Sequence, residues 1–158
     1  MKAPEDVGKQ LQANLGRPIQ ILLVEDSPAD RAMTVEALRG GRIINELSTA
    51  ADGEIAMAFL RREDPFTDAP RPDLIILDLN LPRKDGREVL AEVKADADLK
   101  SIPVIVLTTS SAGSDILQMY RLQAAAYVTK PVGFDAFLQA VAGIEDFWLS
   151  LVRLPPAP

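Results

Sequence analysis

The sequence predicts an α/β fold in which a five-stranded parallel sheet carries helices on both faces. Short, almost uninterrupted apolar runs occupy residues 20–24, 74–78 and 103–108, and such runs are typical of strands that are buried on both sides. Segments with the apolar spacing of helices separate the runs, so strands and helices alternate along the chain. This alternation favours parallel strands joined through helices, in a doubly wound arrangement with five helices.

The segment after the first strand has the sequence of a helix start. Ser27 suits the N-cap, and Pro28 suits the first turn because a proline there loses no intrahelical hydrogen bond. Apolar residues at mixed helical spacing continue to Arg39, and Gly40-Gly41 ends the helix. We expect a second strand at residues 43–50 and a second helix from residue 53 to about residue 62.

The rest of the chain continues the alternation. Three prolines within residues 63–73 predict a loop before the third strand. The prolines at 155, 156 and 158 exclude helix at the end of the chain. We therefore expect an N-terminal extension (1–18), one domain (19–152) and a proline-rich tail (153–158). The remaining expected elements are the strand 74–78, the helix 87–95, the strand 103–108, the helix 114–122 capped by Ser114, the strand 125–129 and a helix from 133 to about 152.

The composition excludes several classes of protein and site. The chain has no cysteine and no histidine. It therefore has no disulfides, no thiol chemistry and no imidazole base, and any metal must be bound by oxygen ligands. The net charge of −6 offers no attraction for nucleic acid. The apolar runs are too short to cross a bilayer, and the first residues lack the apolar core of a secretory signal, so we expect a cytoplasmic protein.

Polar side chains follow four of the predicted strands. Glu25 and Asp26 end the first strand, Asp78 the third and Thr108 the fourth, and Lys130 follows the fifth. Ligands of open α/β sheets bind at the carboxyl ends of the strands, where these residues converge. Three clustered carboxylates repel one another unless a cation intervenes, and Mg²⁺ with oxygen ligands suits them. The ammonium and the hydroxyl would then bind a phosphoryl group.

Four motifs carry a resemblance to a known family. They are ILLVEDSP at 21–28, DLIILDLNLPRKDG at 73–86, PVIVLTTS at 103–110 and AAYVTKP at 125–131. In this order, on strand ends, they resemble the receiver domains of two-component response regulators, over roughly residues 19–145. The resemblance implies a flavodoxin-like fold with strand order 2-1-3-4-5.

The resemblance also implies a role for each motif position. Asp78 would be the phospho-acceptor of a histidine kinase. Mg²⁺ would be the cofactor, with Asp26 and Asp78 as ligands, Glu25 acting through water and the backbone carbonyl of Asn80 completing the protein ligands. The switch and phosphate-binding positions would be the hydroxyl of Thr108, the aromatic ring of Tyr127 and the ammonium of Lys130.

Two features depart from the commonest receiver pattern. Glu25 stands where an aspartate is usual, and the loop 61–72 is longer than in compact receivers. With LNLPRKDG and the FWL segment near the end, this loop resembles the single-domain regulators that partner bacterial phytochrome kinases. The resemblance further implies a cis Lys130–Pro131 peptide, which would turn the ammonium toward the phosphoryl group.

Each position also has an ordinary structural interpretation. Asp26 and Asp78 fit turns or caps, Thr108 fits a strand end, Lys130 fits a surface charge and Tyr127 fits a core edge. Their joint placement at one edge of the sheet favours the functional interpretation.

We therefore predict a stand-alone receiver that takes a phosphoryl group onto Asp78 and signals by conformational change and protein binding. It is not expected to be an enzyme, beyond slow Mg²⁺-dependent loss of its own phosphoryl group. An aspartyl-phosphate phosphatase would need a second acid where the chain has Asn80, and no glycine-rich phosphate loop follows the first strand. A pseudo-receiver that docks without phosphorylation is the alternative.

The last helix suggests a homodimer. Its first half already supplies the apolar arc that covers a sheet, and its second half adds Phe147, Trp148 and Leu149, followed by Leu151, Val152 and Leu154. We expect the projecting end to pack on a second subunit with Trp148 as the anchor. The alternative is that this end is buried within its own chain.

Overall fold

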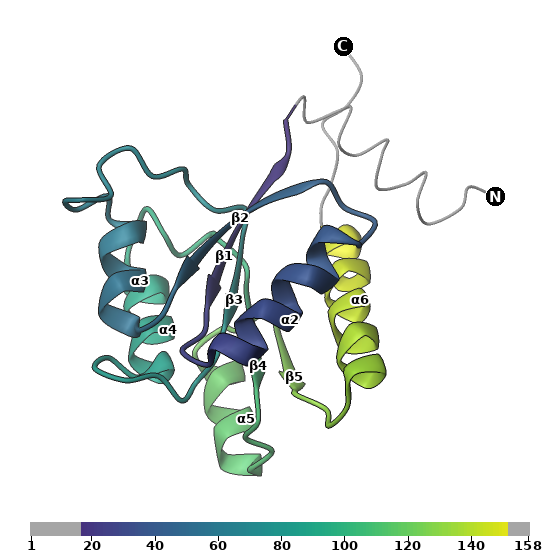
Figure 1. The fold of residues 1–158 in the computed structure, drawn as a ribbon. Coiled ribbons are helices and arrows are strands. Elements are labelled where there is room, and N and C mark those ends of the chain that lie inside the picture. The colour runs from purple at the N-terminus through teal and green to yellow at the C-terminus, as the bar shows by residue number, and fades with distance from the viewer. Residues whose placement is uncertain (1–16, 152–158) are drawn as a thin grey trace.

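Five parallel strands form the centre of the protein (Figure 1), in a computed structural model that describes residues 17–151. The strand order is β2-β1-β3-β4-β5, which confirms the predicted flavodoxin-like topology. In the described residues the strands alternate with five helices. The strands are β1 (Ile19–Val24), β2 (Asn45–Ala50), β3 (Leu74–Leu77), β4 (Val104–Thr108) and β5 (Ala126–Thr129). The helices are α2 (Pro28–Arg39), α3 (Gly53–Leu60), α4 (Gly86–Ala95), α5 (Gly113–Arg121) and α6 (Phe134–Leu151).

Helices cover both faces of the sheet, as expected. Figure 1 shows α2 and α6 on one face and α3, α4 and α5 on the other. Alternate residues of the central strands enter two separate cores, since neighbouring side chains on a strand point to opposite faces. Ile75 and Leu77 pack under α3 and α4, whereas Leu74 and Ile76 pack under α2 and α6.

Two predicted helix caps had different outcomes. Ser27 caps α2, because its hydroxyl accepts a hydrogen bond from the backbone N–H of Asp30 at 3.2 Å. The prediction that Ser114 caps α5 is wrong. The helix begins at Gly113, with Ala112 in the cap position and no side-chain cap, so Ser114 lies within the first turn.

The last helix is buried further along its length than expected. The side chain of Trp148 is 4% exposed and belongs to the core under α2 and α6, so the prediction that it projects toward a second subunit is wrong. The connection before β2 is the physical reason, because it extends the surface that α6 covers. Glu145 accepts a hydrogen bond from the backbone N–H of Ile43 at 3.0 Å, and Arg42 pairs with Asp146. The side chain of Leu151, Val152, Leu154 and the tail lie outside the described residues.

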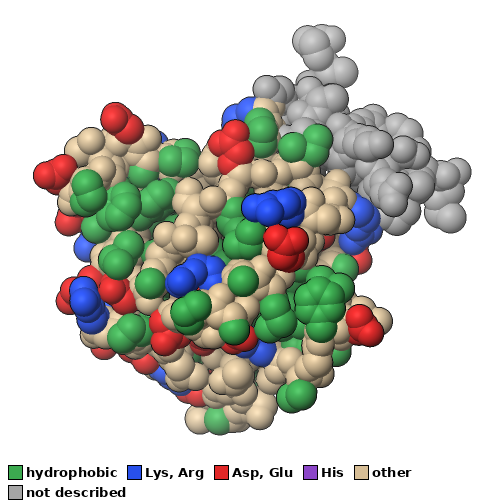
Figure 2. Space-filling model, viewed as in Figure 1, with side chains coloured by type: hydrophobic (Ala, Val, Ile, Leu, Met, Phe, Trp, Pro, Cys, Tyr) green, Lys and Arg blue, Asp and Glu red, His purple; other side chains and the backbone are tan. Residues whose placement is uncertain are grey.

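The surface of the described residues shows no single-sign charge field on the face in Figure 2, where acidic and basic side chains are interspersed. Among the described helices, none combines the length and apolar character that a membrane crossing requires.

Candidate functional site

The register of the sheet brings two acidic residues out side by side. Val24 of β1 lies opposite Leu77 of β3, and the backbone N–H of Asp78 donates to the carbonyl of Val24 at 3.0 Å. Glu25 and Asp78 therefore leave the two strands as neighbours, and both are buried. Carboxylate oxygens of Glu25, Asp26 and Asp78 lie within 4.8 Å of one another. The expected acidic cluster is present at the carboxyl edge of the sheet.

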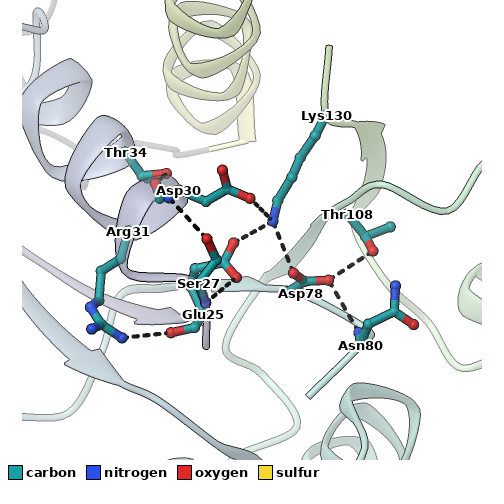
Figure 3. Close-up of polar contacts among 9 residues, drawn as sticks. All are labelled: Glu25, Ser27, Asp30, Arg31, Thr34, Asp78, Asn80, Thr108 and Lys130. Carbon is teal, nitrogen blue, oxygen red and sulfur yellow. Dashed lines mark hydrogen bonds and ion pairs between the residues drawn. The ribbon is translucent and has the colours of Figure 1, made fainter. Parts of the chain in front are cut away.

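Lys130 reaches this cluster from the end of β5 (Figure 3). Its ammonium donates to Asp78 at 2.9 Å and to Glu25, and its side chain is 6% exposed. The expected cis bond is wrong: the one cis peptide among the described residues is Asp64–Pro65, so Lys130–Pro131 is trans. The backbone N–H of Lys130 donates to the carbonyl of Thr108 at 2.7 Å. From that position the long side chain reaches the carboxylates with a trans bond to Pro131.

Asp78 has a hydrogen-bond donor on each oxygen. One oxygen accepts from the Thr108 hydroxyl at 2.8 Å and from the backbone N–H of Asn80 at 3.1 Å, and the other accepts from Lys130. Burial by itself would raise the pKa of Asp78. The hydrogen bonds from Lys130 and Thr108 outweigh it and hold this pKa below its usual range. Asp78 is therefore an ionised carboxylate near neutral pH.

Glu25 differs from Asp78 although the two are neighbours. Burial raises the pKa of Glu25 to about 7, and the negative charge of Asp78 adds to the shift, while Lys130 opposes it. At pH 7 Glu25 is therefore about half protonated, and a bound cation would favour its charged form.

Helix α4 begins directly against the backbone of Asp78. The backbone N–H of Gly86 donates to the carbonyl of Leu79 at 2.9 Å. A Cβ at position 86 would collide with the carbonyl oxygen of Asp78. Only glycine allows this approach, which fixes the loop that carries Asp78 and Asn80.

Tyr127 does not contact the acidic cluster and instead binds the loop that follows Thr108. Its hydroxyl donates to the backbone carbonyl of Ser110 at 2.6 Å. The Ser110 hydroxyl donates to Asp115 at 2.6 Å, and Asp115 pairs with Arg87 at 2.8 Å. The aromatic ring is thus connected to the site through this loop, and the loop is tied to the first turn of α4.

Sequence reasoning missed two parts of this arrangement. Asp30, in the first turn of α2, gives Lys130 a third carboxylate at 2.9 Å. Its signal was its position three residues after the Ser27 cap, which places it beside the end of β1. The Arg87–Asp115 pair left no signal, because it joins the starts of two helices whose relative placement only the fold defines.

The site suits a divalent cation. Among the described residues, Glu25, Asp26 and Asp78 are the one group of three or more acidic side chains close enough to share an ion. Their oxygens are the ligands that Mg²⁺ and Mn²⁺ accept. The carbonyl of Asn80, the fourth expected ligand, belongs to the residue whose N–H binds Asp78.

The chain is similar to known proteins in sequence and fold. The chain is similar to the response regulator Rcp1 of Synechocystis sp., with 51% identity over 140 residues, which cover 89% of this chain and 95% of Rcp1. A crystal structure of Rcp1 in its Mn²⁺-bound form matches with a TM-score of 0.82 and 50% identity, over 88% of this chain and 100% of that one.

Two further solved structures agree. The phosphorylated cyanobacterial phytochrome response regulator RcpA matches with a TM-score of 0.82 and 50% identity, over 88% of this chain and 99% of that one. The bacteriophytochrome response regulator RtBRR matches with a TM-score of 0.70 and 41% identity, over 88% of this chain and 85% of that one. The family model of the response regulator receiver domain matches residues 21–142. The chain therefore belongs to the response regulator receiver domain family, close to the regulators of phytochromes.

Proposed function

We propose that the protein accepts a phosphoryl group on Asp78 from a phosphohistidine of a sensor histidine kinase. The observation that carries this proposal is the environment of Asp78. It is a buried, ionised carboxylate whose two oxygens accept from Thr108 and Lys130, beside two further acids. A structural carboxylate needs no such combination of a cation, a hydroxyl and acidic neighbours.

In the reaction, an oxygen of Asp78 forms a bond to phosphorus and the phosphorus–nitrogen bond to the kinase histidine breaks. The electron pair of that bond stays on the imidazole nitrogen. Lys130 neutralises charge on the transferred oxygens, and Thr108 donates to one of them. The protein contributes the nucleophile and its positioning. It is a phospho-acceptor rather than an enzyme, with slow loss of its own phosphoryl group at most.

Glu25, Asp26, Asp78 and the backbone carbonyl of Asn80 would hold Mg²⁺. When bound, Mg²⁺ offsets the charge of the carboxylates and of the phosphoryl oxygens. The crystal structure of Rcp1 in an Mn²⁺-bound form supports a divalent ion as the cofactor in this proposal.

The output follows from the contacts of the loop after β4. Thr108 already donates to Asp78, so its hydroxyl needs only a small movement to bind a phosphoryl oxygen. The loop after β4 moves with Thr108. The Ser110 carbonyl, which accepts the hydrogen bond from Tyr127, moves with this loop. The surface formed by α5, β5 and α6 is thereby remodelled for a protein partner. A pseudo-receiver is disfavoured, because every position that the chemistry needs is filled.

The decisive test is labelling with acetyl phosphate in the presence of Mg²⁺. Asp78→Asn should abolish incorporation, because an amide does not form an acyl phosphate, whereas Asp26→Asn should slow it by weakening Mg²⁺ binding. Phosphate content is measured by intact mass. Asp78→Asn labelled to the wild-type stoichiometry would place the acceptor elsewhere.

The proposed partner is a phytochrome-type histidine kinase in the cytoplasm, as the similarity to RcpA and RtBRR suggests.

We also keep the homodimer through α6 as a proposal, in a form that no longer uses Trp148. Phe134 begins the helix, is 55% exposed and supplies the apolar contact. Sedimentation at micromolar concentration should give a dimer for the wild type and a weakened one for Phe134→Ser. A monomeric wild type would overturn the dimer.

A further inference from the structure

Lys130 is held by three carboxylates rather than the expected two. Besides Glu25 and Asp78, it donates to Asp30 at 2.9 Å. Figure 3 shows the ammonium between Asp30, which comes from α2, and Asp78, which directly follows β3. An ammonium has three N–H donors, so these carboxylates use all of them.

Asp30 differs from the other two acceptors of Lys130. Oxygens of Glu25 and Asp78 belong to the acidic group that can share a cation, and Asp30 does not belong to it. A bound cation therefore competes with Lys130 for Glu25 and Asp78, and a phosphoryl group consumes an oxygen of Asp78. Asp30 is the acceptor that neither event removes.

The backbone of Asp30 is fixed where this role requires it. Its N–H donates to the Ser27 hydroxyl at 3.2 Å, and its carbonyl accepts from the Thr34 hydroxyl at 2.8 Å. The side chain is 27% exposed, so it lies at the rim of the site and not in the metal cluster. A lysine side chain has many rotamers, and a fixed acceptor on the helix side restricts them.

We propose that Asp30 is a positioning residue for phosphoryl transfer. It holds the ammonium of Lys130 beside Asp78 while the other carboxylates bind the cation. This inference rests on the proposed function, because it concerns the rate of the same transfer. Two other roles make different predictions. If Asp30 repelled the incoming phosphoryl donor, its removal would speed labelling. If it only complemented the dipole of α2, its removal would leave the labelling rate unchanged.

The test measures the rate of acetyl phosphate labelling at saturating Mg²⁺. We expect Asp30→Asn to slow labelling about tenfold, as for loss of one hydrogen bond to a charged group. Mg²⁺ affinity, measured separately by titration, should stay the same. Glu54→Gln is the control, since it also removes an acid from the first turn of a helix, in this case an exposed acid of α3, and it should label at the wild-type rate.

A double-mutant cycle with Lys130→Ala separates positioning from other effects. In that background Asp30→Asn should have no further effect, because the group that it positions is gone. An equal slowing in both backgrounds, an unchanged rate or faster labelling of Asp30→Asn would each overturn the inference. A wild type that acetyl phosphate does not label would overturn the proposed function, and with it this inference. A labelled wild type with an unaffected Asp30→Asn would overturn the inference alone.

Discussion

The protein buries carboxylates at both ends of its sheet, and the two ends satisfy them differently. At the carboxyl ends of the strands, Glu25 and Asp78 share the side-chain ammonium of Lys130. At the opposite end, Glu145 of α6 accepts from the backbone N–H of Ile43, in the connection before β2. A side-chain ammonium can move to another acceptor, whereas a backbone N–H cannot. The first end is therefore suited to chemistry, and the second holds a helix to a loop.

The same difference appears in what each carboxylate can do with its charge. Burial raises the pKa of both Glu25 and Glu145. Glu25 has Asp26 and Asp78 close enough to share a cation, so a bound cation can stabilise its charged form. Among the described residues, Glu145 belongs to no such group. A raised pKa alone therefore does not mark a functional site. The presence of further acidic ligands beside the carboxylate distinguishes Glu25 from Glu145.

The largest expected effect is a loss of stability at the end of the sheet where Glu145 is buried. Glu145→Ala should lower the free energy of unfolding by about 1–3 kcal/mol, because it leaves the buried N–H of Ile43 without an acceptor. Urea unfolding followed by the fluorescence of Trp148, the only tryptophan in the chain, measures this loss. Labelling of the folded variant by acetyl phosphate should be unchanged.

The control for this prediction is the next residue. Asp146→Ala removes an acid that is 61% exposed and pairs with Arg42, and exposed pairs contribute only about 0.2–1 kcal/mol. Equal losses for the two variants would mean that the hydrogen bond to Ile43 does not stabilise the helix end.

A smaller expected effect is the pH dependence of Mg²⁺ binding, which should involve Glu25 and not Glu145. Since the pKa of Glu25 is about 7, Mg²⁺ must displace its proton below that pH. Apparent Mg²⁺ affinity should therefore rise about tenfold between pH 6 and pH 8, as expected for release of one proton. Glu25→Gln should flatten the dependence, while Glu145→Gln should leave it intact. A wild-type affinity that is constant over this range would show that Glu25 is already ionised before Mg²⁺ binds.

Local sequence signals predicted the sheet and the strand-end residues well. The apolar run 74–77 and its following Asp78 are defined by a few neighbouring residues, and parallel topology then brings Glu25 and Thr108 beside them. What failed depended on how distant segments meet. Trp148 looked unpartnered because the core that it joins includes Ile43, which comes from a connection about a hundred residues earlier in the chain.

The errors at the site have different origins. The cis Lys130–Pro131 bond was expected from the family resemblance and not from the geometry of this chain, in which Lys130 reaches Asp78 with a trans bond. Asp30 looked like an ordinary acid at a helix start, and its contact with Lys130 depends on the distance between α2 and β5. Pairings of this kind become visible only when the packing of the layers is known.

The contact between Gly86 and the backbone of Asp78 has a consequence for how the protein tolerates change. At Gly86 no side chain lies between helix α4 and the backbone of Asp78 to absorb a shift. A substitution as small as Gly86→Ala would therefore push on the backbone of Asp78, the proposed phospho-acceptor. Position 86, which bears no chemical group, is constrained as tightly as the residues that do the chemistry, and design on this scaffold should hold it fixed.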